Sequence, residues 1–155
     1  MEDLVLLLIE KGKTISSMES CTGGAFANAI TNVIGASDVI KFSAITYSNE
    51  FKIKMGVDCN TISKYTVYSI QVAREMSKSI SVFSDSDYGV GITGQFNRFD
   101  PNNISSSNNK IYVSIYDKKF DKYYDIFLEA KNVSREKNKN IVIDEIVKLM
   151  KNLCK

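Results

Sequence analysis

The spacing of apolar positions along the chain predicts several helices. Apolar residues recur every three or four positions in four stretches, and each spacing matches one face of a helix. The stretches are 2–11, 26–34, 68–83 and 135–153. A shorter helix is expected over 49–55, and Gly35 and Gly56 stand where the helices before them would end.

Other stretches favour strands, because β-branched and aromatic residues concentrate there. They are 13–18, 39–47, 88–93, 110–116 and 122–128. The last two are predicted to pair antiparallel across a short charged turn at 117–121. Residues 97–109 are rich in Asn and Ser and contain the only proline, Pro101, so a loop is expected there.

After a leading helix, the predicted order is β-α-β-α-α-β-β-β-α. This order is typical of an α/β fold, with a mixed sheet covered by helices on both faces. A chain of 155 residues is long enough to bury a substantial core, and no linker divides it. We therefore expect one domain over residues 1–155, whose strand order the pattern does not specify.

Composition narrows the classes of partner. The chain is 44% hydrophobic and 25% charged, with a net charge of +2, which is too small to indicate nucleic-acid binding. The apolar run at 4–9 is too short to span a membrane. The three cysteines are widely spaced and form no disulfide or metal-binding pattern, so a reducing cytoplasm is expected.

The absence of histidine restricts the chemistry. Ser-His-Asp and Cys-His arrangements and histidine metal sites are excluded. A general base must then be Lys, Asp, Glu, Tyr or a terminal amine. We expect neither a metal ion nor an organic cofactor.

The sequence ESCTGG at residues 19–24 stands where a strand is predicted to become a helix. The first amides of a helix lack internal partners, and Gly23 and Gly24 would leave them open to a carboxylate, a phosphate or an oxyanion. Ser20 would be a nucleophile aimed at that anion. The alternative is structural, because Ser and Thr are favoured helix caps and glycines favour tight turns.

A nucleophilic serine needs a base, and burial lowers the pKa of a lysine toward neutrality. The sequence YSNEFK at residues 47–52 supplies Lys52 after a predicted strand. The alternative is a lysine on the solvated surface. A third sequence, GITG at 91–94, would line the same crevice or simply end a strand.

Together these segments resemble the C-terminal domain of the competence-damage-inducible CinA family, which includes nicotinamide mononucleotide deamidases. The resemblance rests on TISSMESCTGGAFANAITNVIGAS, FSAITYSNEFKIKMGV, SIQVAREM, VGITG and the SRE before the last helix. It implies a three-layer α/β/α sandwich with a mixed, mostly parallel sheet. It also implies hydrolysis of nicotinamide mononucleotide to nicotinate mononucleotide and ammonia, a part in NAD salvage, and a homo-oligomer.

The same resemblance assigns roles to residues. Ser20 corresponds to the nucleophile and Lys52 to its partner. The remaining implied residues contact the substrate: Thr22, Gly23, Gly24, Tyr47, Asn49, Thr93, Gly94 and Arg135. Of these, Arg135 is the expected contact for the substrate phosphate.

The chain also departs from the family pattern. Gly94 is followed by Gln-Phe-Asn-Arg, where family members have further glycines and a proline, and Lys139 replaces a second arginine. Because fold does not guarantee function, a second hypothesis is a nucleotide-binding or regulatory module with little or no turnover. A third is a subunit whose role is protein interaction.

Overall fold

The computed structural model describes residues 1–96 and 109–154. Most of the loop expected at 97–109 therefore lies outside the described residues. The helices are α1 Glu2–Glu10, α2 Ala25–Thr31, α3 Asn49–Lys54, α4 Cys59–Tyr65, α5 Ile70–Ser84 and α6 Arg135–Leu153, with a 3₁₀ turn at Ala36–Asp38. The strands are β1 Ile15–Glu19, β2 Ile40–Ile45, β3 Tyr88–Gly94, β4 Lys110–Asp117 and β5 Lys122–Glu129.

The five strands form one mixed sheet in the order β2-β1-β3-β4-β5. Strand β1 is parallel to both β2 and β3, β4 is antiparallel to β3, and β5 is antiparallel to β4. Four strands thus run in one direction and only β4 opposes them. The predicted antiparallel pair at 110–116 and 122–128 is confirmed as β4 and β5.

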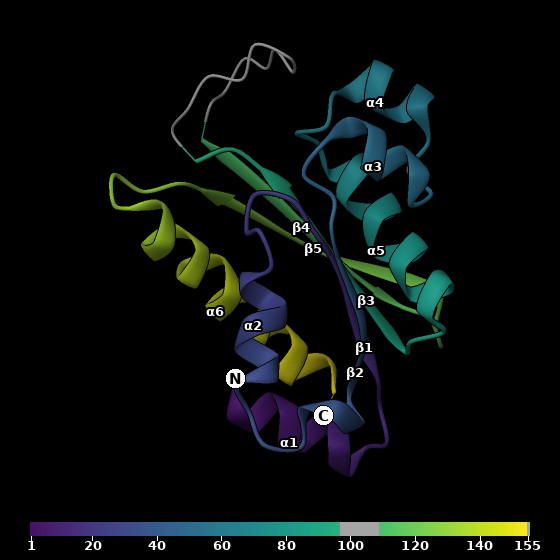
Figure 1. Ribbon diagram of the computed structural model, residues 1–155, viewed down its shortest axis with the longest axis vertical. Coiled ribbons are helices and arrows are strands. Elements are labelled where there is room, and N and C mark those ends of the chain that lie inside the picture. Colours follow the sequence, from purple (N-terminus) through teal and green to yellow (C-terminus); the bar gives the residue numbers. More distant parts are fainter. Residues whose placement is uncertain (97–108, 155) are drawn as a thin grey trace.

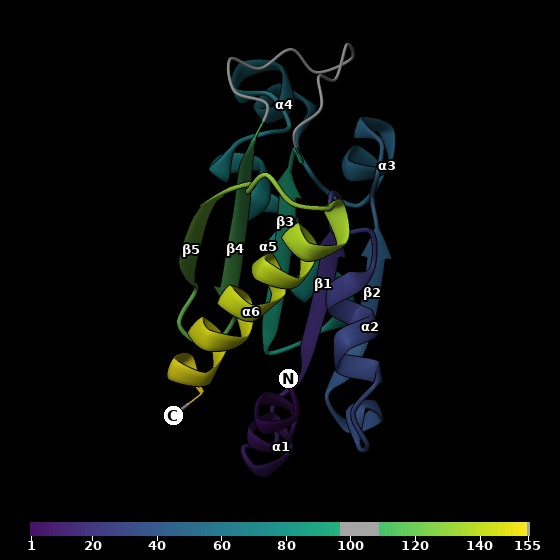
Figure 2. The same ribbon diagram turned by 90° about the vertical axis from the view of Figure 1, so that its left-hand side faces the viewer.

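Helices cover both faces of the sheet, so the predicted three-layer α/β/α architecture is confirmed. Figures 1 and 2 show α1, α2 and α6 on one face and α3, α4 and α5 on the other. The larger apolar cluster lies under α1, α2 and α6 and includes Leu8, Phe26 and Ile146. A smaller cluster, built around Met18 and Met76, lies under α5.

Two glycines of β3 allow α5 to lie directly on the sheet. A Cβ added to Gly89 would fall 1.9 Å from the Ser77 carbonyl oxygen, and one added to Gly91 would fall 2.2 Å from that of Ala73. Any side chain at these two positions would therefore push α5 away from β3.

Helix α4 was not predicted. It has no buried residue, so no apolar stripe marks it in the sequence, and Asp58 begins it by accepting a hydrogen bond from the Asn60 amide at 2.8 Å. Among the helices of the described residues, none is long and apolar enough to cross a membrane.

Candidate active site

The site lies where β1 and β2 end. Because these strands are parallel, their carboxyl ends meet at the same edge of the sheet. The backbone pairing continues past both strands, since the Thr46 amide donates to the Glu19 carbonyl at 2.8 Å and the Ser20 amide donates to the Ile92 carbonyl at 3.0 Å. Residues that follow β1 and β2 are thereby held next to each other.

Ser20 and Lys52 meet at this edge. Ser48 caps α3 by accepting a hydrogen bond from the Phe51 amide, and Lys52 is the buried residue of this helix. The Lys52 Nζ lies 3.0 Å from the Ser20 Oγ and 2.7 Å from the Thr46 carbonyl oxygen. Lys52 is 1% exposed and Ser20 is 8% exposed. The lysine is therefore buried against the serine and is not on the solvated surface.

Ser20 is flanked in register by two threonines. Glu19 pairs with Ile45 on β2 and with Ile92 on β3, so the next positions across the sheet are Thr46, Ser20 and Thr93. The Thr93 hydroxyl donates to the Val67 carbonyl at 2.7 Å, whereas the buried Thr46 hydroxyl has no partner among the described residues. Thr93 thus lies beside Ser20, but its hydroxyl already donates to a backbone carbonyl.

Glu19 was not predicted to matter, yet its carboxylate organises the turn that carries Ser20. The side chain is 0% exposed and accepts five hydrogen bonds, of which three come from amides at the start of α2. The donors are Ser17 Oγ at 3.3 Å, Thr22 Oγ1 at 2.7 Å, and the amides of Gly24 at 3.1 Å, Phe26 at 3.2 Å and Ala27 at 2.9 Å. A buried carboxylate at a helix N-terminus also interacts favourably with the helix dipole.

This carboxylate overturns the expectation that the amides around Gly23 and Gly24 are open to a ligand. The Gly24 amide donates to Glu19, and the Gly23 amide donates to the Ser20 carbonyl at 3.0 Å. Within residues 1–96 and 109–154, the amides of Cys21 and Thr22 donate to no oxygen. The amides of this turn that lack an acceptor are therefore these two, which lie closer to Ser20 in the chain than the glycines do, and both residues are buried.

The glycines instead shape the turn. Gly23 and Gly24 have φ values of 61° and 91°, which side chains disfavour. A Cβ on Gly24 would also lie 3.0 Å from the Ile45 Cδ1 atom. Gly94 is constrained as well, because a Cβ there would fall 2.7 Å from the Lys110 carbonyl oxygen of β4.

Cys21 is the second small nucleophile of the turn, but its thiol packs into the core. It is 5% exposed, and burial raises the pKa of the thiol to about 12. At neutral pH it is almost entirely protonated and hence a poor nucleophile. Of the two neighbours, Ser20 is the one with a basic partner.

Two of the other predicted substrate contacts meet above the site. The Arg135 guanidinium donates to the Phe96 carbonyl oxygen and to the Tyr47 hydroxyl, each at 3.4 Å, and lies over the Phe96 ring. Tyr47 is 64% exposed, and Arg135 is exposed at the first turn of α6. Asn49 is half-buried at the first turn of α3. These side chains are accessible to a ligand.

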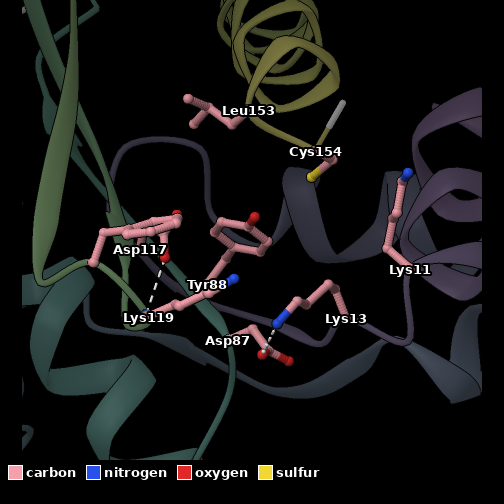
Figure 3. A pocket seen from close by; sticks show the side chains of 9 residues that line it. Lys11, Lys13, Asp87, Tyr88, Asp117, Lys119, Leu153 and Cys154 are labelled. Atoms are coloured by element: carbon pink, nitrogen blue, oxygen red, sulfur yellow. Dashed lines mark hydrogen bonds and ion pairs between the residues drawn. The ribbon is translucent and has the colours of Figure 1, made fainter.

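A hollow of about 200 Å³ lies at the opposite end of the sheet and contains none of the predicted site residues (Figure 3). Its lining includes Asp87, Tyr88 and Cys154. Burial raises the pKa of both the Tyr88 phenol and the Cys154 thiol, so both groups are neutral at pH 7. Burial also raises the pKa of Asp87, but hydrogen bonds from Lys13 and Thr14 outweigh it and hold that pKa below its usual value. This hollow lacks an activated nucleophile.

A family model of the CinA C-terminal domain matches residues 1–151. Among curated relatives, the putative competence-damage inducible protein of Clostridium kluyveri is 46% identical over 94 residues, which cover 60% of this chain and 23% of that protein. A CinA-like protein of Endomicrobium trichonymphae is 45% identical over 89 residues, which cover 57% of this chain and 21% of the relative. The chain thus matches less than a quarter of the length of these relatives.

Solved structures share the fold over nearly the whole chain. A competence/damage inducible protein from Agrobacterium tumefaciens superposes with a TM-score of 0.87, at 22% identity, covering 99% of this chain and 95% of that one. A CinA superfamily protein from Klebsiella pneumoniae superposes with a TM-score of 0.89, at 17% identity, covering 99% and 94%. At these identities the likeness establishes the fold.

Proposed function

The chain belongs to the CinA C-terminal domain family, and from that premise we propose that it is an amidohydrolase that converts nicotinamide mononucleotide to nicotinate mononucleotide and ammonia. The observation that carries the proposal is the 3.0 Å contact between the Ser20 hydroxyl and the buried Lys52 amine. Such a pair provides a nucleophile and a base without histidine. The open Tyr47 and Arg135 side chains nearby provide a place for the rest of a nucleotide.

In the first half-reaction, Ser20 attacks the carboxamide carbon. Removal from water disfavours the charged form of a lysine, and the neutral amine of Lys52 accepts the Ser20 proton as the new C–O bond forms. Negative charge develops on the carboxamide oxygen, where the amides of Cys21 and Thr22 donate to it. The Lys52 ammonium then protonates the amide nitrogen, the C–N bond breaks and ammonia leaves.

In the second half-reaction, water takes the place of ammonia. Lys52 removes a proton from the water as its oxygen attacks the nicotinoyl ester on Ser20. The resulting intermediate collapses, and the Ser20 oxygen leaves with a proton returned by Lys52. The carboxylic acid product ionises to nicotinate mononucleotide, and both side chains regain their starting state. The Thr46 carbonyl, at 2.7 Å from Nζ, holds the amine in place during both proton transfers.

Substrate orientation requires a cation for the phosphate. Arg135 suits this role because its guanidinium is held by two long hydrogen bonds, to Phe96 and Tyr47, and no carboxylate among residues 1–96 and 109–154 pairs with it. A guanidinium forms paired, charge-assisted hydrogen bonds with phosphate oxygens. The substrate would then lie from Arg135 toward Ser20.

The test is ammonia release from nicotinamide mononucleotide by the wild-type protein, with calorimetric binding measured in parallel. We expect steady turnover, at a rate that rises with pH as an amine loses its proton. Binding of the mononucleotide with no ammonia released would support the regulatory-module hypothesis instead. A rate controlled only by a carboxylate would contradict the role given to Lys52.

A further inference from the structure

Thr46 carries a buried hydroxyl that the fold does not use. The residue is 2% exposed, and its Oγ1 atom forms no hydrogen bond within the part of the chain that the structure describes. By contrast, the hydroxyl of Thr93, on the other side of Ser20, donates to the Val67 carbonyl at 2.7 Å. Burying a hydroxyl without a partner costs free energy, and buried polar groups are nearly always paired. The Thr46 hydroxyl therefore calls for a partner in another state of the site.

The Thr46 side chain lies on the face of the sheet that carries Lys52. A Cβ added to Gly24, at the start of α2, would lie 3.0 Å from the Ile45 Cδ1 atom, so Ile45 points toward α2. The strand pairing continues through Thr46, whose amide donates to the Glu19 carbonyl. Successive side chains of a strand point to opposite faces, so Thr46 points toward α3, which lies across the sheet from α2 (Figure 1). The Thr46 carbonyl already accepts from the Lys52 Nζ at 2.7 Å.

A partner for the hydroxyl arises when Lys52 becomes charged. An ammonium group carries three donors and no acceptor. In the proposed reaction Lys52 takes the Ser20 proton and stays an ammonium until ammonia leaves. Rotation about the Cα–Cβ bond of Thr46 moves the hydroxyl among staggered positions without moving the backbone. A hydroxyl oxygen turned toward Nζ accepts a stronger hydrogen bond from the charged amine than from the neutral one.

We propose that Thr46 is a positioning residue for the proposed reaction, and that its hydroxyl accepts a hydrogen bond from the Lys52 ammonium. The inference rests on the proposed function, because the proton transfer from Ser20 is what creates that ammonium. The hydroxyl and the carbonyl of Thr46 then hold two N–H groups, and the third points at the leaving nitrogen. An interaction that strengthens as the charge develops lowers the barrier rather than stabilising the ground state.

Other charges near Lys52 do not change when Thr46 is replaced by valine. These groups are Glu19 and Cys21 at the end of β1 and in its turn, Arg135 on α6, and Glu50 and Lys54 on the helix of Lys52 itself. The Cys21 thiol is neutral at pH 7 because burial raises its pKa to about 12. A difference in the pKa of Lys52 between wild type and Thr46→Val therefore reports on the hydroxyl.

The experiment measures the pKa of Lys52 by carbon NMR of protein isotopically labelled at the lysine Cε atoms. The Lys52 signal is assigned by its loss in Lys52→Met. Because the hydroxyl stabilises the charged amine, Thr46→Val should move the titration midpoint down by about one pH unit. Thr46→Ser keeps a hydroxyl and should keep the wild-type midpoint. The matched control is Ser114→Ala on β4, which removes another buried hydroxyl without a partner in the described residues and should leave the midpoint unchanged.

Stability and turnover distinguish a positioning role from a structural one. Valine has the shape of threonine without the hydroxyl, so Thr46→Val should unfold at a urea concentration no lower than wild type does. Thr93→Val instead leaves the Val67 carbonyl without its donor and should unfold at a lower urea concentration. On the high-pH plateau, Thr46→Val should lower kcat for nicotinamide mononucleotide about 10-fold with little change in KM, because one charge-assisted hydrogen bond is lost.

The outcomes separate this inference from the proposed function. If the Lys52 midpoint falls in Thr46→Val and the wild type releases no ammonia, the contact between hydroxyl and ammonium stands and the proposed function fails. If the wild type releases ammonia but the midpoint is the same in both proteins, or falls equally in Thr46→Ser, the role of Thr46 is overturned and the function stands. Unfolding of Thr46→Val at a clearly lower urea concentration would also overturn it, because the hydroxyl would then have a structural partner.

Discussion

Glu19→Gln provides the sharpest test of how the turn that carries Ser20, residues 19–24, is built. The carboxylate accepts five hydrogen bonds in a site with 0% exposure, and three of the donors are amides that α2 cannot satisfy internally. Glutamine is similar in size but keeps only one acceptor oxygen and turns an NH₂ group toward the remaining donors. Each hydrogen bond to a charged group contributes about 1.5–3 kcal/mol, and the side-chain cap about 0.5–2 kcal/mol.

Because glutamine retains part of this network, we expect the free energy of unfolding to fall by about 2–4 kcal/mol. Urea denaturation at pH 7 measures this free energy, with Glu145→Gln as the matched control, since Glu145 is a half-exposed carboxylate 3.9 Å from Lys148. Where the variant is still folded, kcat for the proposed deamidation should fall, because Ser20 follows Glu19 directly and shifts with the turn. An unchanged unfolding free energy, within about 0.5 kcal/mol, would refute the argument that this carboxylate organises the turn.

Three further predictions concern the scaffold and its thiols. Gly24→Ala should destabilise the fold by more than the roughly 1–2 kcal/mol expected from its left-handed backbone, because its Cβ would also meet a β2 side chain. Gly12→Ala, also at a positive φ (58°, against 91° at Gly24) but in open space, should show the backbone cost alone in the same denaturation assay. Asp87→Asn should lower the free energy of unfolding at pH 7. Because folding depresses the pKa of Asp87, the difference in unfolding free energy between variant and wild type should shrink as the pH falls below about 4. A difference that does not depend on pH would be evidence against the hydrogen-bonded carboxylate. Iodoacetamide at pH 8 should label the exposed Cys59 and leave the buried Cys21 unmodified, as measured by peptide mass spectrometry. The labelled protein should release ammonia as fast as the untreated protein. Labelled Cys21 in folded protein would contradict its burial.

Much of the fold could be predicted from the spacing of apolar residues within single segments. Helices α1, α5 and α6 have long apolar stripes, and their predicted ranges differ from the observed ends by only a few residues. The strand order did not follow, because it depends on which strands pair across the sheet rather than on any one segment. Helix α4 was missed for a related reason, since a helix without a buried face has no apolar period to detect.

The candidate site, like the fold, was predicted in part. The two motifs at residues 19–24 and 47–52 pointed to Ser20 and Lys52, and parallel pairing of β1 with β2 explains why the pair meets. Glu19 was overlooked because a carboxylate in the sequence reads as a solvated charge. The one available signal was its place at the end of a strand, directly before a turn with two glycines. Its effect on the amides of α2 depends on side-chain direction, which residue spacing does not specify.

The proposed hydrolysis depends most on the bond that the Ser20 oxygen forms with the carboxamide carbon. The most direct test is ammonia release from nicotinamide mononucleotide by Ser20→Ala and Lys52→Met, with circular dichroism showing that both are folded. We predict that each variant loses about 10⁴-fold or more in kcat, because the two groups act as a unit. A folded Ser20→Ala protein that still releases ammonia at the wild-type rate would contradict the proposed mechanism.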